Sequence, residues 1–384
     1  MEITDVVVHT LSAEDVKKAA DATQSTAVIE VETDAGITGI GEASTSPWVV
    51  KTIIDAPFSN VRVQGLREIL VGEDPFDVRK LWDEMFYGTY GMGRKGAAII
   101  AISGVDIALW DIIGKASGRP IYELLGGNYR DSVRAYASTL FPQNPHDTEY
   151  MRGKSQRFVD EGFSAVKFGW GSFGDSPETD DQLLTAARET LGPEVDLMVD
   201  AGFCWETDVK NGVKYINQLD ENHDLFWVEE PVYAENHAGY ARLSESCQTR
   251  IVGGESEYTS YGFKVLLEQG QVDGVQPDVA RSGGISQLVE IASLARRHGV
   301  PLFPHGYSTG IVIAASLQVI AATENALLME YVVEGGDLRW ELVNEEFQFE
   351  DGQIAIPDEP GLGISLNRDI IDRYTMDLDR INNK

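Results

Sequence analysis

The sequence predicts an α/β protein: a barrel of alternating strands and helices, preceded by a smaller α+β domain. Three observations lead to this fold class. From Val133 onward, short apolar runs alternate with amphipathic helical segments at intervals of about 25 residues. These runs are too continuously apolar for half-exposed strands, which is typical of a buried parallel sheet. Before Val133, strands come first and helices follow as a group.

Residues 1–127 make up the predicted first domain. The runs at 6–11 and 25–36 have the composition of antiparallel strands and are separated by the polar stretch Ser12 to Gln24. Helical spacing of apolar residues follows from Val49 to Leu125 and is clearest in residues 96–118. Two segments, 12–24 and 44–55, are expected to be loops that could reach across a neighbouring pocket.

Residues 128–342 make up the predicted barrel, with eight strands, which is enough to close it. The strands are expected at 133–138, 165–169, 196–200, 225–230, 250–255, 274–278, 301–304 and 326–331. The remaining residues, 343–384, return to short strands and glycine-rich turns. We expect this C-terminal tail to pack against the first domain.

Composition predicts a soluble cytoplasmic protein. A chain of 384 residues with 43% hydrophobic content can bury a large core without disulfides. Cys204 and Cys247 are its only cysteines, which favours a reducing compartment. The N-terminus has no basic and then apolar leader, and no run of about 18 apolar residues occurs, so we expect no membrane partner.

The chain is strongly acidic. It has 31 basic and 62 acidic residues, a net charge of −31, which repels phosphate backbones and argues against nucleic acids and anionic membranes as partners. The acids are spread over the whole chain, beside a normal share of hydrophobic residues. This pattern favours a solvated halophilic surface over a disordered acidic tail.

Ionisable side chains stand where the predicted barrel strands end. In a (β/α) barrel the C-terminal ends of all strands face the same mouth, so these side chains should share one pocket. An unpaired charge at the exit of a buried strand costs several kcal/mol, and its presence there indicates a function. The residues are Lys167, Asp200, Glu229, Glu230, Glu255, Asp278, His305 and Glu330.

Asp200, Glu229 and Glu255 are predicted to bind a metal ion. Three carboxylates from successive strands suit Mg²⁺, with Mn²⁺ as a possible substitute, and no Cys or His joins them to favour zinc. The alternative for a single acid is a strand-end residue that caps the next helix. Because neighbouring strand residues point to opposite faces, only one of Glu229 and Glu230 can enter the mouth, and the other would have a supporting role.

Asp278 and His305 follow the next two predicted strands. Their side chains could touch, so that the carboxylate orients the imidazole as a general base. His298 differs, because it lies at a predicted helix C-terminus where a positive charge is simply favourable.

Lys167 and Glu330 complete the candidate catalytic set. Lys167 could bind a substrate carboxylate, although an internal salt bridge to Asp200 is the alternative. Glu330 could donate a hydrogen bond to a developing oxyanion if its acidic neighbours keep it protonated. Together these parts describe abstraction of a proton next to a carboxylate, with the enediolate held by Mg²⁺, Lys167 and Glu330.

The chain resembles the mandelate racemase and muconate lactonizing enzyme branch of the enolase superfamily. The motifs are GVDIALWDIIGKASGRPIYELLGG at 104–127, followed in order by AVKFG, VDAG, EEP, GGE, QPDVARSGGIS and PHG. The resemblance covers nearly the whole chain. It implies a modified TIM barrel, (β/α)7β, with an α+β N-terminal capping domain completed by the C-terminal tail. It also implies Mg²⁺ on Asp200, Glu229 and Glu255, the Asp278–His305 dyad as acid and base, and Glu330 near the substrate carboxylate.

One departure from the family pattern bears on the reaction. Members often carry Lys-x-Lys on the second barrel strand, where the second lysine is a base on the face opposite the histidine. Here the triplet is Lys167, Phe168 and Gly169, so that base is missing. A dehydratase can work with one base, so the sequence predicts dehydration of a sugar acid, an aldonate or aldarate, to a 2-keto-3-deoxy acid.

Two other functions remain open from sequence. A racemase, epimerase or cycloisomerase would need a base for the opposite face, for which Tyr90, Lys17 and Lys18 are candidates. A non-catalytic acid-binding protein is the third reading. Substrate-binding candidates in the first domain are Trp48, Tyr87, Tyr90 and Arg94, and Arg94 could bind the second carboxylate of an aldarate. Relatives of this kind often form symmetric oligomers, so we expect a homo-oligomer.

Overall fold

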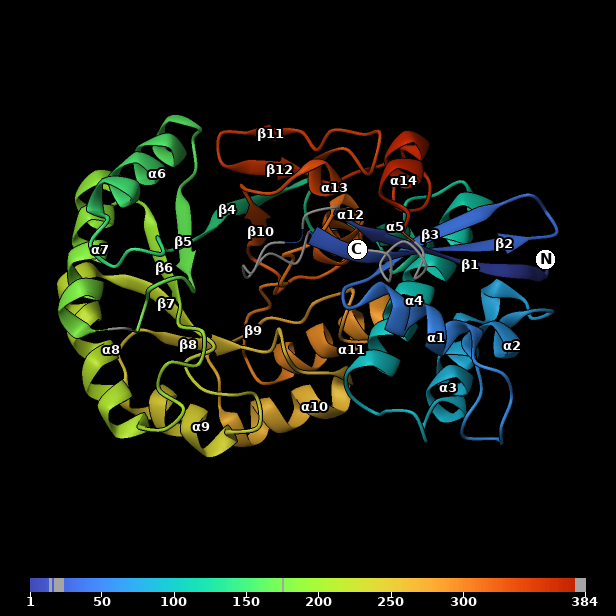
Figure 1. The fold of residues 1–384 in the computed structure, drawn as a ribbon, viewed down its shortest axis with the longest axis horizontal. Helices are drawn as coiled ribbons and strands as arrows, with labels where there is room; N and C mark the ends of the chain where they lie inside the picture. Colours follow the sequence, from blue (N-terminus) through green and yellow to red (C-terminus); the bar gives the residue numbers. More distant parts are fainter. Residues whose placement is uncertain (14–15, 17–23, 175, 377–384) are drawn as a thin grey trace.

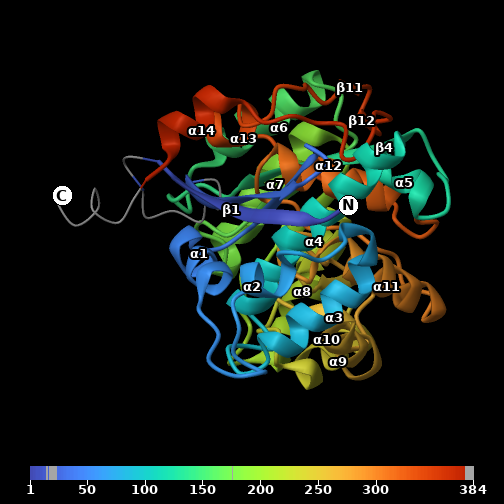
Figure 2. The same cartoon turned by 90° about the vertical axis from the view of Figure 1, so that its right-hand side faces the viewer.

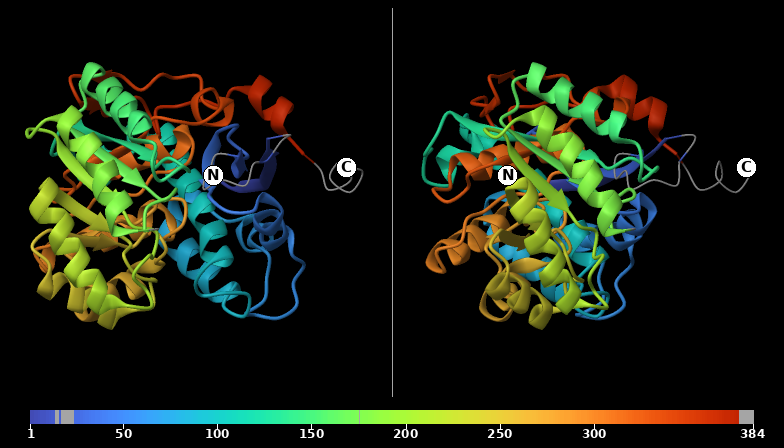
Figure 3. Two further views of the ribbon diagram at one scale, coloured as in Figure 1. Left: turned by 60° about the vertical axis from the view of Figure 1, so that its left-hand side comes forward. Right: turned by 90° about the vertical axis from the view of Figure 1, so that its left-hand side faces the viewer.

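A computed structural model describes residues 1–13, 16, 24–174 and 176–376 of the chain. A smaller domain built from the first part of the chain lies beside a strand and helix barrel (Figure 1). The barrel's parallel strands are surrounded by helices, which form its outer layer (Figure 3). The fold class predicted from the sequence is confirmed: a modified TIM barrel with an α+β capping domain.

The capping domain begins with a three-stranded antiparallel sheet in the order β1-β2-β3. Its strands are β1 (Ile3–Ser12), β2 (Ser25–Thr33) and β3 (Thr38–Ala43). The helices that follow are α1 (Pro47–Asp55), α2 (Leu66–Leu70), a 3₁₀ turn (Pro75–Asp77), α3 (Val78–Gly88), α4 (Ala97–Ser117) and α5 (Ile121–Leu124). Figure 2 shows α2, α3 and α4 on one side of β1.

The prediction of a loop at 44–55 is wrong for most of its length. Helix α1 begins there at Pro47, a residue favoured at the first helical position, and it buries Val50, Ile53 and Ile54 at helical spacing. The other predicted loop, 12–24, lies mostly outside the described residues.

Helix α4 is the core of the capping domain and packs directly on β3. A Cβ atom at Gly41 would lie 1.9 Å from the carbonyl oxygen of Gly104, so only glycine allows this approach. Among the described residues, α4 is the one helix long and apolar enough to cross a membrane, but 89% of its apolar window is buried inside the protein. Its apolar character is therefore explained by its place in the core.

The barrel follows with parallel strands in the order β4-β5-β6-β7-β8-β9, and β10 pairs with β4. The strands are β4 (Ser132–Leu140), β5 (Ala165–Gly169), β6 (Asp196–Asp200), β7 (Leu225–Glu229), β8 (Arg250–Gly253), β9 (Gly274–Val275) and β10 (Met329–Val332). The helices between them are α6 (Thr148–Asp160), α7 (Pro177–Leu191), α8 (Val209–His223), α9 (His237–Ser246), α10 (Thr259–Val265) with the π turn Leu266–Gly270, α11 (Gly284–Arg297) and α12 (Gly310–Ala321).

Several predicted strands are shorter than expected, most of all those at 274–278 and 301–304. The strand predicted at 274–278 ends at Val275, and 301–304 makes only isolated bridges, including Val275 to Leu302 and Leu302 to Ala326. The physical reason is proline, which has no N–H for a ladder, at positions 277, 301 and 304. These bridges still connect β9, through Leu302, to Ala326, which lies three residues before β10.

The C-terminal tail contacts both parts of the protein. It contains α13 (Asp337–Trp340), β11 (Phe349–Glu350), β12 (Gln353–Ala355) and α14 (Arg368–Tyr374). Strand β12 extends the barrel sheet by pairing with β4, whereas α14 lies on the capping sheet, where Arg368 bonds Glu30 at 2.6 Å. The expectation that the tail packs on the first domain therefore describes its later part, because β11 and β12 join the barrel.

The close contact between β3 and α4 gives a test of the fold. Gly41→Ala places a methyl group against the α4 backbone, and we expect it to lower the free energy of unfolding by about 3 kcal/mol. Gly153→Ala is the control, because Gly153 lies in α6 with nothing near its missing Cβ, and alanine there should be neutral or stabilising by about 1 kcal/mol. Thermal unfolding midpoints measure both, and equal midpoints for the two variants would contradict the packing argument.

Candidate active site

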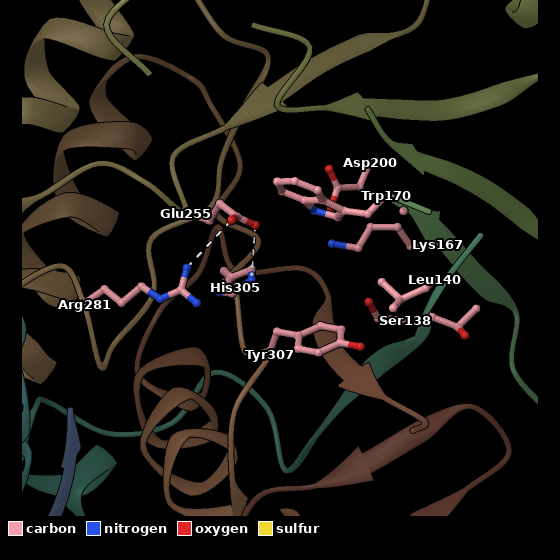
Figure 4. A pocket seen from close by; sticks show the side chains of 11 residues that line it. Ser138, Leu140, Lys167, Trp170, Asp200, Glu255, Arg281, His305 and Tyr307 are labelled. Atoms are coloured by element: carbon pink, nitrogen blue, oxygen red, sulfur yellow. Dashed lines mark ion pairs between the residues drawn. The ribbon is translucent and has the colours of Figure 1, made fainter. Parts of the chain in front are cut away.

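A cavity of about 320 Å³ opens at the C-terminal ends of the barrel strands (Figure 4). This is the end at which the predicted ionisable residues emerge, as expected for the mouth of a TIM barrel. The cavity is lined by Ser138, Thr139, Leu140, Lys167, Gly169, Trp170, Asp200, Glu255, Arg281, His305 and Tyr307.

Three carboxylates converge beside this cavity. Asp200 and Glu229 are the last residues of β6 and β7 and pair directly in the sheet, while Glu255 follows β8. One oxygen from each lies within 4.8 Å of the others. Burial, with repulsion from Glu229, raises the pKa of Asp200 well above its ordinary value, and burial raises the pKa of Glu229. Such a cluster needs positive charge to stay ionised.

Gly169 is the neighbour of Asp200 in the same row of the sheet. A Cβ at position 169 would lie 2.8 Å from the Cβ of Asp200 and 2.9 Å from its Oδ2. This spacing leaves no room for a side chain at Gly169. A side chain at position 169 would thus require Asp200 to shift.

Glu229 and Glu230 have different surroundings, although both are buried. Glu229 accepts hydrogen bonds from Lys167 and from Gln276 on the cavity side. Glu230 instead accepts a bond from the backbone N–H of Gly254 at 2.9 Å and from the hydroxyl of Tyr240 at 3.3 Å, and burial raises its pKa to about 8. Glu230 thereby holds the residue that precedes Glu255.

His305 and Asp278 are in direct contact. The distance from His305 Nδ1 to Asp278 Oδ2 is 2.7 Å, and a β-bridge joins the two backbones. The other ring nitrogen, Nε2, lies 3.2 Å from Glu255 Oε2. Although burial opposes the charge, Glu255 and Glu330 raise the pKa of His305 to about 9. Since Asp278 occupies Nδ1, Nε2 is the nitrogen available to a substrate.

Lys167 joins the carboxylates to Glu330. Its Nζ lies 2.7 Å from Glu229 Oε1 and 2.9 Å from Glu330 Oε1, and the side chain is 4% exposed. Although burial opposes the charge, Glu229 and Glu330 raise the pKa of Lys167 well above its ordinary value. The salt bridges of Lys167 thus go to these two glutamates and not to Asp200, the partner considered as the alternative to substrate binding.

The surroundings of Glu330 favour its ionised form over the protonated form that the sequence left open. Burial opposes its charge, but Lys167 and His305 lower its pKa to about 2. Its oxygens accept bonds from the hydroxyl of Ser138 at 2.7 Å and the backbone N–H of Gly306 at 2.8 Å. In this state Glu330 accepts hydrogen bonds and has no proton to donate to an oxyanion.

Sequence reasoning missed several polar residues at the site, and two of them contact its acids. Arg281 lines the cavity, with Nε 3.4 Å from Asp278 Oδ2 and a terminal nitrogen 3.7 Å from Glu255 Oε1. Gln276 donates to Glu229 Oε2 at 2.6 Å. Both could have been found from the sequence, because they are close neighbours of the predicted site residue Asp278. Gln276 precedes it by two residues and Arg281 follows it by three.

The predicted substrate-binding residues of the capping domain do not line this cavity. Tyr90 and Arg94 line a separate pocket with Tyr87 and Tyr261, where Arg94 stacks on the Tyr90 ring at 5.3 Å. Trp48 lies half-buried on α1 and is not among the described residues that line the cavity. Lys17 and Lys18 lie outside the described residues.

A capped barrel with acids at successive strand ends is the architecture of enolase-type enzymes. Residues 3–126 match the mandelate racemase / muconate lactonizing enzyme N-terminal domain family, and residues 150–370 match the enolase C-terminal domain-like family. The chain therefore belongs to the mandelate racemase and muconate lactonizing enzyme branch of the enolase superfamily.

Several characterised relatives are similar along nearly their whole length. The chain is 34% identical to D-galactarolactone cycloisomerase of Agrobacterium fabrum, covering 91% of both chains. It is 33% identical to arabinonate dehydratase of Saccharolobus solfataricus, covering 94% of this chain and 93% of that one. It is also 33% identical to D-xylonate dehydratase of Haloferax volcanii, with 91% and 85% covered. The two dehydratases are hydro-lyases.

Solved structures show the same fold. A racemase from Streptomyces coelicolor A3(2) with bound magnesium superposes with a TM-score of 0.85 at 27% identity, covering 97% of this chain and 100% of that one. The donor set here also fits Mg²⁺, which prefers carboxylate oxygens. One oxygen of each carboxylate lies within 4.8 Å of the others, so these three residues could hold the ion together.

The carboxylate cluster predicts a metal-dependent stability. We expect Mg²⁺ at 100 times its dissociation constant to stabilise the protein by about 2.7 kcal/mol, which a thermal shift measures. Asp200→Asn should lose this shift, because one anionic ligand is removed. Without Mg²⁺ the variant should be at least as stable as wild type, because repulsion with Glu229 is relieved. Asp196→Asn, at the opposite end of β6, is the control. A full Mg²⁺ shift in Asp200→Asn would contradict the assignment.

Proposed function

We propose that the protein is a Mg²⁺-dependent dehydratase that converts a sugar acid, an aldonate or aldarate, to a 2-keto-3-deoxy acid. One observation carries the proposal: His305, held by Asp278, lines a cavity together with two of the three carboxylates, Asp200 and Glu255, while Gly169 supplies no second base. The sugar-acid dehydratases among the relatives support the same reaction class.

In this mechanism His305 acts twice from Nε2. It first takes the α-proton of the sugar acid, with Asp278 holding the ring through Nδ1. As an imidazolium it then protonates the β-hydroxyl, which leaves as water and gives an enol. The enol takes a solvent proton at C3 and becomes the 2-keto-3-deoxy acid.

Charged neighbours prepare the site for this chemistry. Lys167 is fixed between Glu229 and Glu330, so its positive charge is placed to meet the substrate carboxylate. Bound by Asp200, Glu229 and Glu255, Mg²⁺ would stabilise the enediolate oxygens and offset the charge of Glu255 next to His305. Arg281 supplies a second fixed positive charge beside Asp278.

A racemase, epimerase or cycloisomerase is the second candidate. The cycloisomerase among the relatives favours it. Tyr90 lies in another pocket, which removes one candidate for a second base. Such an enzyme would interconvert substrate and isomer one to one, without forming a keto acid.

Further expectations accompany this proposal. A small-molecule substrate agrees with the relatives, which are metabolic enzymes. We propose a cytoplasmic location and a salt-adapted surface from the net charge of −31. We also propose a homo-oligomer, with neither nucleic acid nor membrane as partner.

The proposal predicts a specific product. With Mg²⁺ and high KCl, the protein should form a 2-keto-3-deoxy acid from at least one member of a library of aldonates and aldarates, and a chelator should abolish this. His305→Asn should lower turnover at least about 100-fold, because the base is lost, while keeping the Mg²⁺ thermal shift. His298→Asn, at the exposed end of α11, is the matched control. Activity of His305→Asn above about one percent of wild type would rule out this role of His305.

A further inference from the structure

Glu42 is a fully buried carboxylate that the mechanism above does not use. It is the penultimate residue of β3 in the capping domain, and its relative exposure is 0%. Three hydroxyl groups donate to it: Thr26 at 2.7 Å and Ser308 at 2.5 Å to Oε1, and Thr309 at 2.5 Å to Oε2. Two of these donors belong to the barrel, so Glu42 connects the two domains.

The two barrel donors belong to the turn that follows His305. Ser308 is three residues beyond His305, and Thr309 is the N-cap of α12. The hydroxyl of Thr309 accepts from the backbone N–H of Ile311 while it donates to Glu42. Glu42 therefore also stands at the N-terminus of a 12-residue helix, where a negative charge is favourable.

The same end of β3 also touches the turn that follows Asp278. The backbone N–H of Ser44 donates to the carbonyl of Ala280, and the N–H of Ala280 donates to Asp278 Oδ1 at 2.7 Å. Because Gly41 packs against α4 without any spare space, this strand end cannot shift easily. One rigid segment, residues 42–44, thus supports the turns that follow both members of the dyad.

We propose that Glu42 is a positioning residue for the His305 base: from the capping domain it fixes the Ser308–Thr309 turn, and with it the orientation of the His305 ring toward Asp278 and the substrate. The expected effect on kcat rests on the proposed function. The orientation of the His305 ring can be tested whatever the reaction is.

The test compares Glu42→Gln with Glu42→Leu. Glutamine can keep all three contacts, because its carbonyl oxygen accepts from Thr26 and Ser308 and its amide donates to Thr309. Leucine has a similar shape and can keep none. We expect Glu42→Leu to lower kcat about 100-fold with KM and the Mg²⁺ thermal shift little changed, and Glu42→Gln to retain most activity.

Glu30→Leu is the matched control. Glu30 is a buried glutamate on β2 of the same sheet, but it bonds His9 and Arg368, away from the dyad. We expect this variant to lose thermal stability while its kcat is unchanged. Thr309→Val removes one of the three contacts of Glu42, together with the cap bond from Ile311, and its kcat should fall about 10-fold even if Glu42→Leu does not fold.

A proton NMR readout separates this proposal from the proposed function. The His305 Nδ1–H that faces Asp278 should give a downfield signal, identified by its loss in His305→Asn. The signal should disappear in Glu42→Leu and persist in Glu42→Gln and Glu30→Leu. If wild type does not dehydrate any sugar acid, the proposed function is wrong. The NMR comparison of the variants would still test whether Glu42 orients the His305 ring. If folded Glu42→Leu keeps the kcat and the NMR signal of wild type, the proposal is wrong. If Glu42→Leu does not fold, the same result in Thr309→Val would overturn it. Equal losses of kcat and signal in Glu30→Leu would also overturn it.

Discussion

The concentration of negative charge at the barrel mouth is the constraint on which the rest of the structure depends. The buried or nearly buried acids are Asp200, Glu229, Glu255, Asp278 and Glu330. These acids lie at the C-terminal ends of parallel strands, which all meet at one end of the barrel. They could be separated only if the pairing register of the strands changed. Lys167, Arg281 and His305 each lie between two of these acids and balance part of the charge. The remaining excess beside Asp200 and Glu229 would be neutralised by the proposed Mg²⁺.

The capping domain provides the mechanical support for this charged site. Helix α4 holds the loop after Asp278, since Asp106 accepts from the backbone and hydroxyl of Ser286, and Ser103 accepts from the N–H of Gly283. Strand β3 holds the turn after His305 through Glu42. The dyad is therefore fixed from outside the barrel as well as by its own strands. Cap and barrel act as a single unit at this point.

The sequence predicted the parts that depend on local patterns. Apolar runs located β5 and β6 residue for residue, and strand ends located the carboxylates, because period and position are both readable along the chain. Proline shortened the strands at 274–278 and 301–304, a local effect that could have been foreseen. The contacts of Glu42 with residues 308 and 309 span more than 260 positions, and no local pattern reports them. Likewise the ionised state of Glu330 depends on Lys167 and His305 in space.

The central claim is that His305 alone moves the α-proton, on one face of the substrate. The most direct measurement follows the reaction in D₂O, with analysis of the product and of recovered substrate. The account predicts one deuterium at C3 of the keto acid, and recovered substrate that keeps its configuration at C2. Recovered substrate with inverted configuration at C2, or exchange at C2 that persists in His305→Asn, would contradict it.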